Sequence, residues 1–419
     1  MVKECERSTL MFKEVKECRC CGSEDLVPYL DLGDQPLANS YHKGEEIETF
    51  PLKIKVCNEC FHSQLSVVVA PDLMFKNYLY VSGTTHTFRK HCDKLAKDAV
   101  EYWFNTGGIK LPISMMELSP KVLDIACNDG TLLDYFRDID CDVQGVDPAE
   151  NLREITKEKD IPVEVGFWGT GVHERLDGKF DIITGTNVFA HVDEINDFLV
   201  QCTKVLNDKG IIVLEFPYCD NMISDCEFDT IYHEHLSYFL VNSFKNNVET
   251  KGLGIVRILR TPIHGGSIRF FLKQGERHCV DVYHLIEDEE AKGLLKRGTY
   301  AAFGRQVEKN KSDMQGLVAN LKSQGKTVIG YGASAKGNTM LNYFELDLDY
   351  IVDDNEMKWD YLTPGRNIPI KSPEAMKDED ELYIVILAWN FFDEIVEKIG
   401  KITGKKHHYI RYVPEVSCT

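Results

Sequence analysis

The chain has 419 residues, 43% hydrophobic and 10% aromatic, a composition that excludes wholesale disorder and leaves room for two or three domains. A formal net charge of -19 without a long basic run argues against a nucleic-acid substrate, because a nucleic-acid surface needs a dense cationic face. No apolar run has the length of a membrane span, and the charged start MVKECERSTLMFKEVKE lacks the apolar core of a signal peptide. We therefore expect a cytoplasmic protein without a membrane or nucleic-acid partner.

Two CxxC pairs lie near the N-terminus, Cys18 with Cys21 and Cys57 with Cys60, each beside turn-forming residues. Two such knuckles place four thiolates around a tetrahedral zinc ion, which is predicted to be structural because protein ligands fill all four positions. A redox pair is the weaker alternative, since neither CxxC opens a helix after a strand. Cys20 adds a competing thiol that only the spacing sets aside. We predict a zinc-binding module over residues 1–72.

A helical lead-in follows over residues 73–112, with a helix predicted at about 85–104. From Lys121 onward, apolar strands at 121–123, 142–146, 162–165, 180–184 and 210–216 alternate with helical stretches, which implies a parallel sheet covered on both faces. The segments 255–260 and 267–272 are expected to form a closing antiparallel pair. Residues 73–280 are thus predicted to form a Rossmann-like domain.

The segment Asp124-Ile-Ala-Cys-Asn-Asp-Gly130 follows the first of these strands, and the second strand ends in Gly145-Val-Asp147. An acid at that strand end can accept hydrogen bonds from both ribose hydroxyls of a bound nucleoside. A carboxylate disfavours NADP, because it would repel the phosphate on the ribose. A turn with one glycine instead of three has no evident binding site for a pyrophosphate. The pattern therefore favours S-adenosylmethionine over NAD, with a coincidental acid in a doubly wound domain as the alternative.

The predicted cofactor-binding residues lie in the first turn, at the end of the second strand and after the fourth strand: Asp124, Ala126, Asn128, Gly130, Asp147, Pro148 and Asn187.

Titratable side chains gather beyond the fourth and fifth strands. His191 follows the fourth strand, and Tyr232-His-Glu-His235 lies about fifteen residues beyond the fifth. Segments past the carboxyl ends of parallel strands form the rim of an active site. Such side chains can act as base and acid, whereas a metal site or a polar loop without a role are weaker alternatives.

Strand and helix signals resume after a charge-rich helical stretch at 281–323. Gly330-Tyr-Gly-Ala-Ser-Ala-Lys-Gly337 follows a strand and opens a helix at about 336–344, and further strands are expected at 350–352 and 382–388. A glycine turn at a helix N-terminus suits a phosphate or nucleotide, with Ser334, Lys336 and Asn338 as additional donors. A plain strand–helix turn is the alternative. Residues 281–419 are predicted to form a second Rossmann-like domain, to which the resemblance described below assigns the nucleotide sugar.

Nearly the whole chain resembles the sugar C-methyltransferase family. The resemblance rests on the four-cysteine module, on LDIACNDG, NVFAHV, EFPY and YHEHLSYF, and on GYGASAKGNTMLNY, VDDNEMKWDYLTPGRNIPI and AWNF. One departure is visible, because Cys127-Asn128 occupies a turn where family members often carry Gly or Ser. The fold implied is α/β, with a zinc-binding module and two Rossmann-like domains.

The resemblance implies an enzyme that uses S-adenosylmethionine to methylate C-3′ of a dTDP- or GDP-linked 4-keto-deoxysugar, through an enolate formed by a base. It implies His235 as that base, with Tyr232, Glu234, His191 and either Tyr78 or Tyr80 around the sugar. Tyr218, Asp353 and Asn390, within the matching segments, complete the predicted substrate set. An O- or N-methyltransferase acting on a sugar or small metabolite is the alternative, and a monomer is expected.

Overall fold

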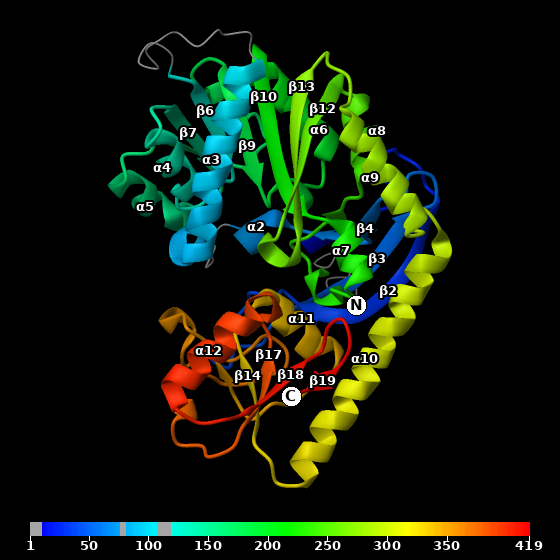
Figure 1. Cartoon of the computed structure of the whole chain (residues 1–419), viewed down its shortest axis with the longest axis vertical. Helices are drawn as coiled ribbons and strands as arrows, with labels where there is room; N and C mark the ends of the chain where they lie inside the picture. Colours follow the sequence, from blue (N-terminus) through cyan, green and yellow to red (C-terminus); the bar gives the residue numbers. More distant parts are fainter. Residues whose placement is uncertain (1–10, 76–80, 107–118) are drawn as a thin grey trace, which may run out of the picture.

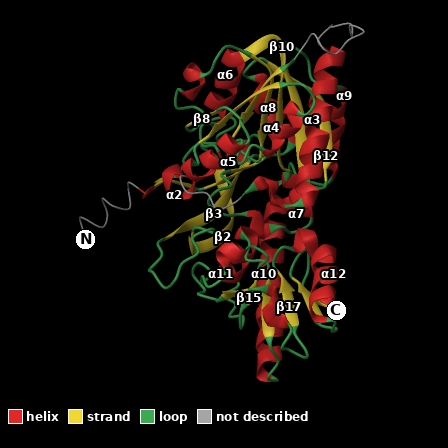
Figure 2. Cartoon of the chain, turned by 90° about the vertical axis from the view of Figure 1, so that its left-hand side faces the viewer, coloured by secondary structure: helices red, strands yellow, loops and turns green. Residues whose placement is uncertain are grey.

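The computed structural model describes residues 11–75, 81–106 and 119–419. Two α/β units lie one above the other along the long axis, and the long helix α10 (Arg297–Ser323) runs beside the lower one (Figure 1). The strands of the N-terminal module lie between the two units, on the side of α10 (Figure 1). Figure 2 shows the same stacking from the side, with β2 and β3 beneath the upper unit.

The N-terminal module is built on two small sheets. Strand β1 (Phe12–Glu14) pairs antiparallel with β5 (Val67–Val69). The second sheet has the order β11-β4-β3-β2 and contains β2 (Leu26–Pro36), β3 (Thr49–Cys57), β4 (Ser63–Leu65) and β11 (Ser237–Tyr238). Strand β11 comes from the YHEHLSYF segment, far beyond the proposed module boundary at residue 72. The zinc module and the central unit therefore share a sheet.

The central unit holds a seven-stranded sheet of order β12-β13-β10-β9-β6-β7-β8, in which only β12 and β13 introduce antiparallel pairing. The strands are β6 (Lys121–Ile125), β7 (Asp142–Asp147), β8 (Val163–Val165), β9 (Phe180–Thr186), β10 (Leu206–Pro217), β12 (Leu253–Thr261) and β13 (Ser267–Gln274). The inner parallel strands β6, β9 and β10 are mostly buried, as expected for a sheet with helices on both faces, whereas the edge strand β8 is half-buried. The predicted strands and the closing antiparallel pair are thus present.

The helices of the central unit are α2 (Pro71–Phe75), α3 (His86–Thr106), α4 (Thr131–Arg137), α5 (Arg153–Glu158), α6 (Ile195–Val205), α7 (Cys219–Ser224) and α8 (Val241–Glu249). Helix α3 packs its apolar side, including Phe88 and Trp103, into the core. A buried ion-pair network also holds it to the sheet: His91 Nε2 lies 2.5 Å from Glu215 Oε1 on β10, and Arg269 Nε on β13 donates to Glu215 Oε2 at 2.8 Å. The start of α3 is thereby fixed above the strand ends.

The C-terminal unit follows α9 (Val280–Ala291) and α10. Its six-stranded sheet has the order β16-β15-β14-β17-β18-β19 and is parallel except for β19. The strands are β14 (Val328–Tyr331), β15 (Ile351–Val352), β16 (Ile370–Lys371), β17 (Tyr383–Ile386), β18 (His408–Arg411) and β19 (Ser417–Cys418), and the helices are α11 (Ala335–Tyr343) and α12 (Phe392–Thr403). The predicted α/β fold class, with two such units and an N-terminal cysteine module, is confirmed. Within the described ranges, no helix combines the length and apolar character needed to span a bilayer.

Candidate active site and metal centre

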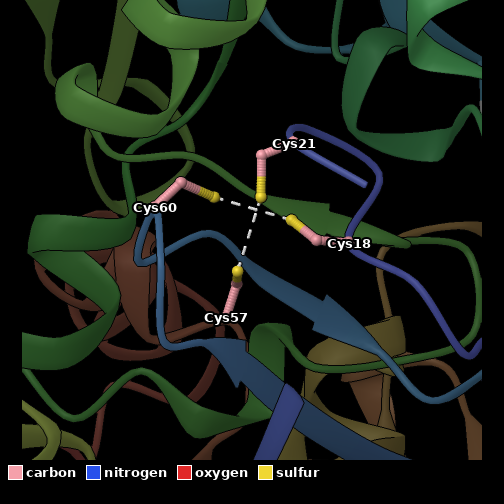
Figure 3. A group of neighbouring side chains, drawn as sticks. All are labelled: Cys18, Cys21, Cys57 and Cys60. Atoms are coloured by element: carbon pink, nitrogen blue, oxygen red, sulfur yellow. Dashed lines mark hydrogen bonds between the residues drawn. The ribbon is translucent and has the colours of Figure 1, made fainter. Parts of the chain in front are cut away.

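The four cysteines predicted to bind zinc converge on one centre, as Figure 3 shows. Their sulfur atoms all lie within 4.8 Å of one another, with 3.5 Å between Cys18 and Cys60 and 3.6 Å between Cys21 and Cys57. A tetrahedral zinc with bonds of about 2.3 Å requires sulfur atoms roughly 3.8 Å apart. The donor set therefore fits zinc, and Cys20, although buried, is not a member of this cluster.

Tight turns place each pair of thiols. The amide of Gly22, at φ 75°, donates to the Cys18 carbonyl at 2.8 Å, and the amide of Phe61 donates to the Cys57 carbonyl at 3.0 Å. Both turns bring two cysteines three residues apart onto the same side. Nothing in this geometry leaves a coordination position for a substrate, so the site is built for a structural ion.

The zinc module contacts the YHEH segment directly. Arg19, next to Cys18, donates from Nη1 to the Leu236 carbonyl at 3.0 Å, and the Leu65 amide donates to the same carbonyl at 3.0 Å. Asn39 Nδ2 donates to Glu234 Oε1 at 2.6 Å. Because these contacts surround His235 in the chain, the position of the YHEH segment depends on the module.

A cavity of about 620 Å³ opens at the carboxyl ends of β6, β7 and β9. Six of the seven predicted cofactor residues line it: Asp124, Ala126, Asn128, Asp147, Pro148 and Asn187. Gly130 does not. It begins α4 at φ 74°, and a Cβ there would lie 2.6 Å from Ile161 Cδ1, so the glycine serves the turn. The strand–turn–helix geometry inferred from the sequence therefore surrounds one cavity of nucleoside size.

Asp147 lines this cavity and also holds the neighbouring backbone in place. Its Oδ2 accepts from the Asn128 amide and its Oδ1 from the Ala149 amide, both at 2.8 Å, which ties the second strand end to the first turn. Burial raises its pKa. Burial also raises the pKa of Asp124 to about 7, while Asp124 Oδ1 accepts from Thr184 Oγ1 at 2.6 Å. These carboxylates fit the ribose and the cationic methyl donor of S-adenosylmethionine.

Aromatic side chains that were not predicted also line the cavity. Phe75 and Phe88 come from the lead-in helices, and Phe167 and Trp168 come from Gly166-Phe-Trp-Gly169 after β8. An aromatic pair between glycines after the third strand is the signal that could have identified this part of the wall. Such side chains offer apolar contact area to the base of a bound nucleoside.

His235 stands beside this cavity with both imidazole nitrogens engaged. Its Nδ1 donates to the Thr230 carbonyl at 2.9 Å, so Nε2 carries the lone pair and accepts from the Tyr232 hydroxyl at 2.7 Å. Its ring lies 4.9 Å from the ring of His191, which lines the cavity. Burial lowers the pKa of His235 well below its ordinary value and that of His191 to about 4, so both imidazoles are neutral at pH 7. A neutral imidazole can accept a proton.

The remaining members of the motif differ in their surroundings. His233 turns away, with Nε2 3.3 Å from the Phe50 carbonyl of the N-terminal module. Glu234 accepts from Asn39. Tyr78 and Tyr80 lie outside the described residues, so their predicted place beside the sugar stays a prediction.

A second cavity, of about 200 Å³, lies at the carboxyl ends of β14 and β17. Ser334 and Asp353 line it, together with Thr85 from the start of α3. Asp353 Oδ2 accepts from the Ala333 amide at 2.7 Å, and Ser334 caps α11 by accepting from the Gly337 amide at 3.1 Å. Ser82 and Phe88, on either side of Thr85 in the chain, line the first cavity, so the segment that leads into α3 contributes to the walls of both cavities.

Lys336 lies at the junction of the two units rather than in the second cavity. Its Nζ donates to the His264 carbonyl at 3.2 Å and lies 4.3 Å from the centre of the Trp389 ring. Asn390 follows Trp389 in the same short 3-10 helix. Asp229 accepts from Trp389 Nε1 at 2.8 Å, so this junction joins side chains from both units.

Two predicted substrate residues have structural partners instead. Asn338 is buried, and its amide donates to the Ala38 carbonyl at 2.8 Å, which joins α11 to the N-terminal module. Tyr218 is buried, with its hydroxyl donating to Glu289 Oε1 at 2.6 Å, and it lines neither cavity described above. Tyr218 directly follows β10, and its phenol is bonded to Glu289 of α9; the predicted substrate contacts of Asn338 and Tyr218 stay predictions.

Three family models match the chain: "Putative zinc binding domain" over residues 18–75, "Methyltransferase domain" over residues 87–258 and "C-methyltransferase C-terminal domain" over residues 262–414. The chain is 30% identical over 416 residues to the C-methyltransferase NovU of Streptomyces niveus, and the match covers 96% of each chain. It is 31% identical over 109 residues to the ubiquinone biosynthesis O-methyltransferase of Bartonella quintana (strain Toulouse), covering 24% of this chain and 43% of that one. The solved PH0226 protein from Pyrococcus horikoshii OT3 matches with a TM-score of 0.36 and 16% identity, covering 46% of this chain and 94% of its own.

Proposed function

The chain belongs to the C-methyltransferase family and is an S-adenosylmethionine-dependent enzyme with a zinc-binding module; on this premise we propose that it methylates C-3′ of a nucleotide-linked 4-keto-deoxysugar. The nucleotide, dTDP or GDP, is proposed to bind the C-terminal unit at the cavity lined by Ser334 and Asp353. The sugar then extends past Lys336 toward His235. We propose that the enzyme acts as a monomer on this substrate.

The observation that carries the proposal is the neutral His235–Tyr232 pair beside His191, at the edge of the cofactor cavity. A 4-keto group acidifies the proton on C-3′, so a modest base suffices to remove it. An O- or N-methyltransferase has no carbon acid to deprotonate. Since methylation of a hydroxyl can also use a base, it is this base together with the full-length similarity to a C-methyltransferase that favours methylation of carbon.

His235 is proposed to receive the substrate proton on Nε2. The transfer is proposed to run through Tyr232, because its hydroxyl already donates to that nitrogen. The Tyr232 oxygen takes the proton from C-3′ while the Tyr232 hydroxyl proton moves to His235 Nε2. The Thr230 carbonyl stabilises the imidazolium through Nδ1–H, and the enolate formed nearby balances its charge. Bound S-adenosylmethionine supplies an electrophilic methyl group, and the two units supply much of the rate by holding both reactants in place.

The remaining site residues are proposed to orient the sugar. The ring of His191 lies 4.9 Å from that of His235 and presents an imidazole, and Glu234, which precedes His235 in the chain, presents a carboxylate. Lys336 and Asn390 belong to the C-terminal unit: Lys336 lies over the Trp389 ring, and Asn390 follows Trp389 in the chain. Donors close to O-4′ would stabilise the enolate oxygen.

The proposal is tested by hydrogen exchange without methyl transfer. In deuterium oxide with S-adenosylhomocysteine, the wild-type enzyme should introduce deuterium at C-3′ of a dTDP- or GDP-linked 4-keto-deoxysugar, and His235→Asn should slow exchange by about 10²–10⁴-fold. His233→Asn is the matched control, because His233 belongs to the same motif but contacts Phe50. Exchange by His235→Asn at the wild-type rate would assign the base elsewhere.

A further inference from the structure

The turn between β12 and β13 holds a histidine in an unfavourable backbone conformation. His264, in the 3-10 helix Ile263–Gly265, has φ 56° and ψ 28°, in the left-handed region that favours glycine. Two glycines with positive φ follow it, and a Cβ on Gly265 would lie 2.7 Å from both Glu227 Oε1 and Trp389 Cη2. The turn is thus pressed between the central and C-terminal units, and a non-glycine residue at position 264 is retained there at a cost in stability.

The imidazole of His264 has a buried nitrogen without a partner among the described residues. Its Nε2 is inaccessible to solvent and forms no hydrogen bond to any described residue. Buried polar atoms in native proteins are nearly always paired, so an unpaired one requires an explanation. One explanation is that the hydrogen-bond partner of this nitrogen is an atom of the bound substrate.

His264 lies among residues of the proposed active site. Its ring is 5.9 Å from the ring of Phe88, which lines the cofactor cavity, and its carbonyl accepts from Lys336 Nζ at 3.2 Å. It is also close enough to His235 for a charge on either ring to affect the other. The turn therefore brings a third histidine beside Phe88 and Lys336, within electrostatic range of His235.

The charge state of His264 suits a hydrogen-bond donor. Burial, helped by the positive charge of Lys336, lowers its pKa to about 4. The ring is then neutral at pH 7 and has one N–H to donate. Lys336 beside it supplies the positive charge that an anionic ligand requires.

We propose that His264 donates a hydrogen bond from Nε2 to an anionic oxygen of the bound nucleotide sugar, next to Lys336, and is a further catalytic residue of this enzyme. The inference rests on the nucleotide-sugar substrate proposed above. Two substrate oxygens have this chemistry: the enolate oxygen at C-4′ and the diphosphate oxygens. The strain at position 264 is then the cost of placing that donor.

Two substitutions distinguish the effect of the side-chain hydrogen-bond donor from that of the backbone conformation at position 264. His264→Asn keeps a residue that tolerates the left-handed region but withdraws the donor from the position of Nε2. His264→Gln retains an amide donor at about that reach and cannot accept a proton. His284→Asn, exposed on α9, is the matched control and should leave every measurement unchanged.

The experiment measures kcat, KM and binding of dTDP or GDP for each variant, with the free energy of unfolding by chemical denaturation. We expect His264→Asn to unfold no more readily than wild type. If the partner is the enolate oxygen, kcat should fall by about 10²–10³-fold with unchanged nucleotide affinity. If the partner is the diphosphate, nucleotide affinity should instead fall by roughly ten-fold or more. In either case, His264→Gln should recover part of the loss.

Two results would overturn the inference: kcat, KM and nucleotide affinity of His264→Asn all within about three-fold of wild type, or a His264→Gln variant as impaired as His264→Asn. The first removes any role in the reaction, and the second removes the donor role. A wild-type enzyme that does not turn over any 4-keto sugar would contradict the proposed function instead, so the two failures are distinguishable.

Discussion

Loss of the zinc site should impair methyl transfer more than it impairs cofactor binding. The perturbation is Cys57→Ser, which removes one of the four sulfur atoms at the metal centre. Structural zinc sites contribute about 10–16 kcal/mol in small zinc-binding peptides, as much as the whole stability of a typical domain. Even a partial loss is therefore expected to loosen the turns that hold β3 and β4.

The effect reaches the active site through the shared sheet. Strand β4 pairs with β11 at Gln64↔Ser237 and Ser63↔Tyr238, and Arg19 and Leu65 both bond the Leu236 carbonyl next to His235. A displacement of about 1 Å in a catalytic group costs about 10²-fold in rate, so we expect kcat/KM to fall on that order. The cofactor cavity is built mainly on β6, β7 and β9, although α2 contributes Phe75. Affinity for S-adenosylhomocysteine should consequently change by only a few-fold.

The assay combines elemental analysis for zinc, calorimetric titration with S-adenosylhomocysteine and steady-state methyl transfer. Cys202→Ser is the matched control, since Cys202 is buried alone in α6 and lies outside the metal cluster. Wild type and control should contain about one zinc per chain. A Cys57→Ser protein that lacks zinc and still turns over at the wild-type rate would refute the coupling through β4 and β11.

Three further outcomes are expected. Asp147→Ala should weaken S-adenosylhomocysteine binding roughly ten- to hundred-fold, as measured by calorimetry. The substitution removes a charged acceptor and leaves the Asn128 and Ala149 amides unpaired. Unchanged affinity would mean that the ribose lies elsewhere. Tyr232→Phe should slow methyl transfer by about ten-fold or more with unchanged cofactor affinity, and a wild-type rate would exclude the proton relay. Burial raises the pKa of Glu227 from 4.5 to about 8. Between these two values the folded state keeps a proton that the unfolded state has released, so the free energy of unfolding falls as the pH rises. Glu227→Gln should flatten that decline in denaturation experiments between about pH 5 and pH 8, and equal slopes for both proteins would contradict the raised pKa.

Local patterns were sufficient to predict the fold, the zinc-binding cysteines and the segments that surround the first cavity. The acid of Gly145-Val-Asp147 and the turn after β6 are defined by strand–turn–helix geometry, and the structure gathers both around one cavity. The predicted family is confirmed by the full-length match. The zinc ligands could also be predicted from the sequence, because CxxC spacing is a local property, and the structure brings the four sulfur atoms together.

Contacts between distant segments could not be read from the sequence. The pairing of β4 with β11 joins residues more than 170 positions apart, and the bond from Tyr218 to Glu289 spans 71. The left-handed conformation of His264 likewise depends on packing between the two units. Local spacing carries no signal for such contacts, which is why the bond from Tyr218 to Glu289 was not anticipated and the histidine of TPIHGGS was not singled out.

The position of the transferred methyl group tests the central claim most directly. The enzyme is incubated with S-adenosylmethionine carrying a ¹³C-methyl group and with dTDP- or GDP-linked 4-keto-deoxysugars, and the product is examined by carbon–proton correlation NMR. The account predicts a methyl carbon bonded to C-3′, with the C-3′ proton lost. A methyl group on oxygen or nitrogen, or on another ring carbon, would contradict it.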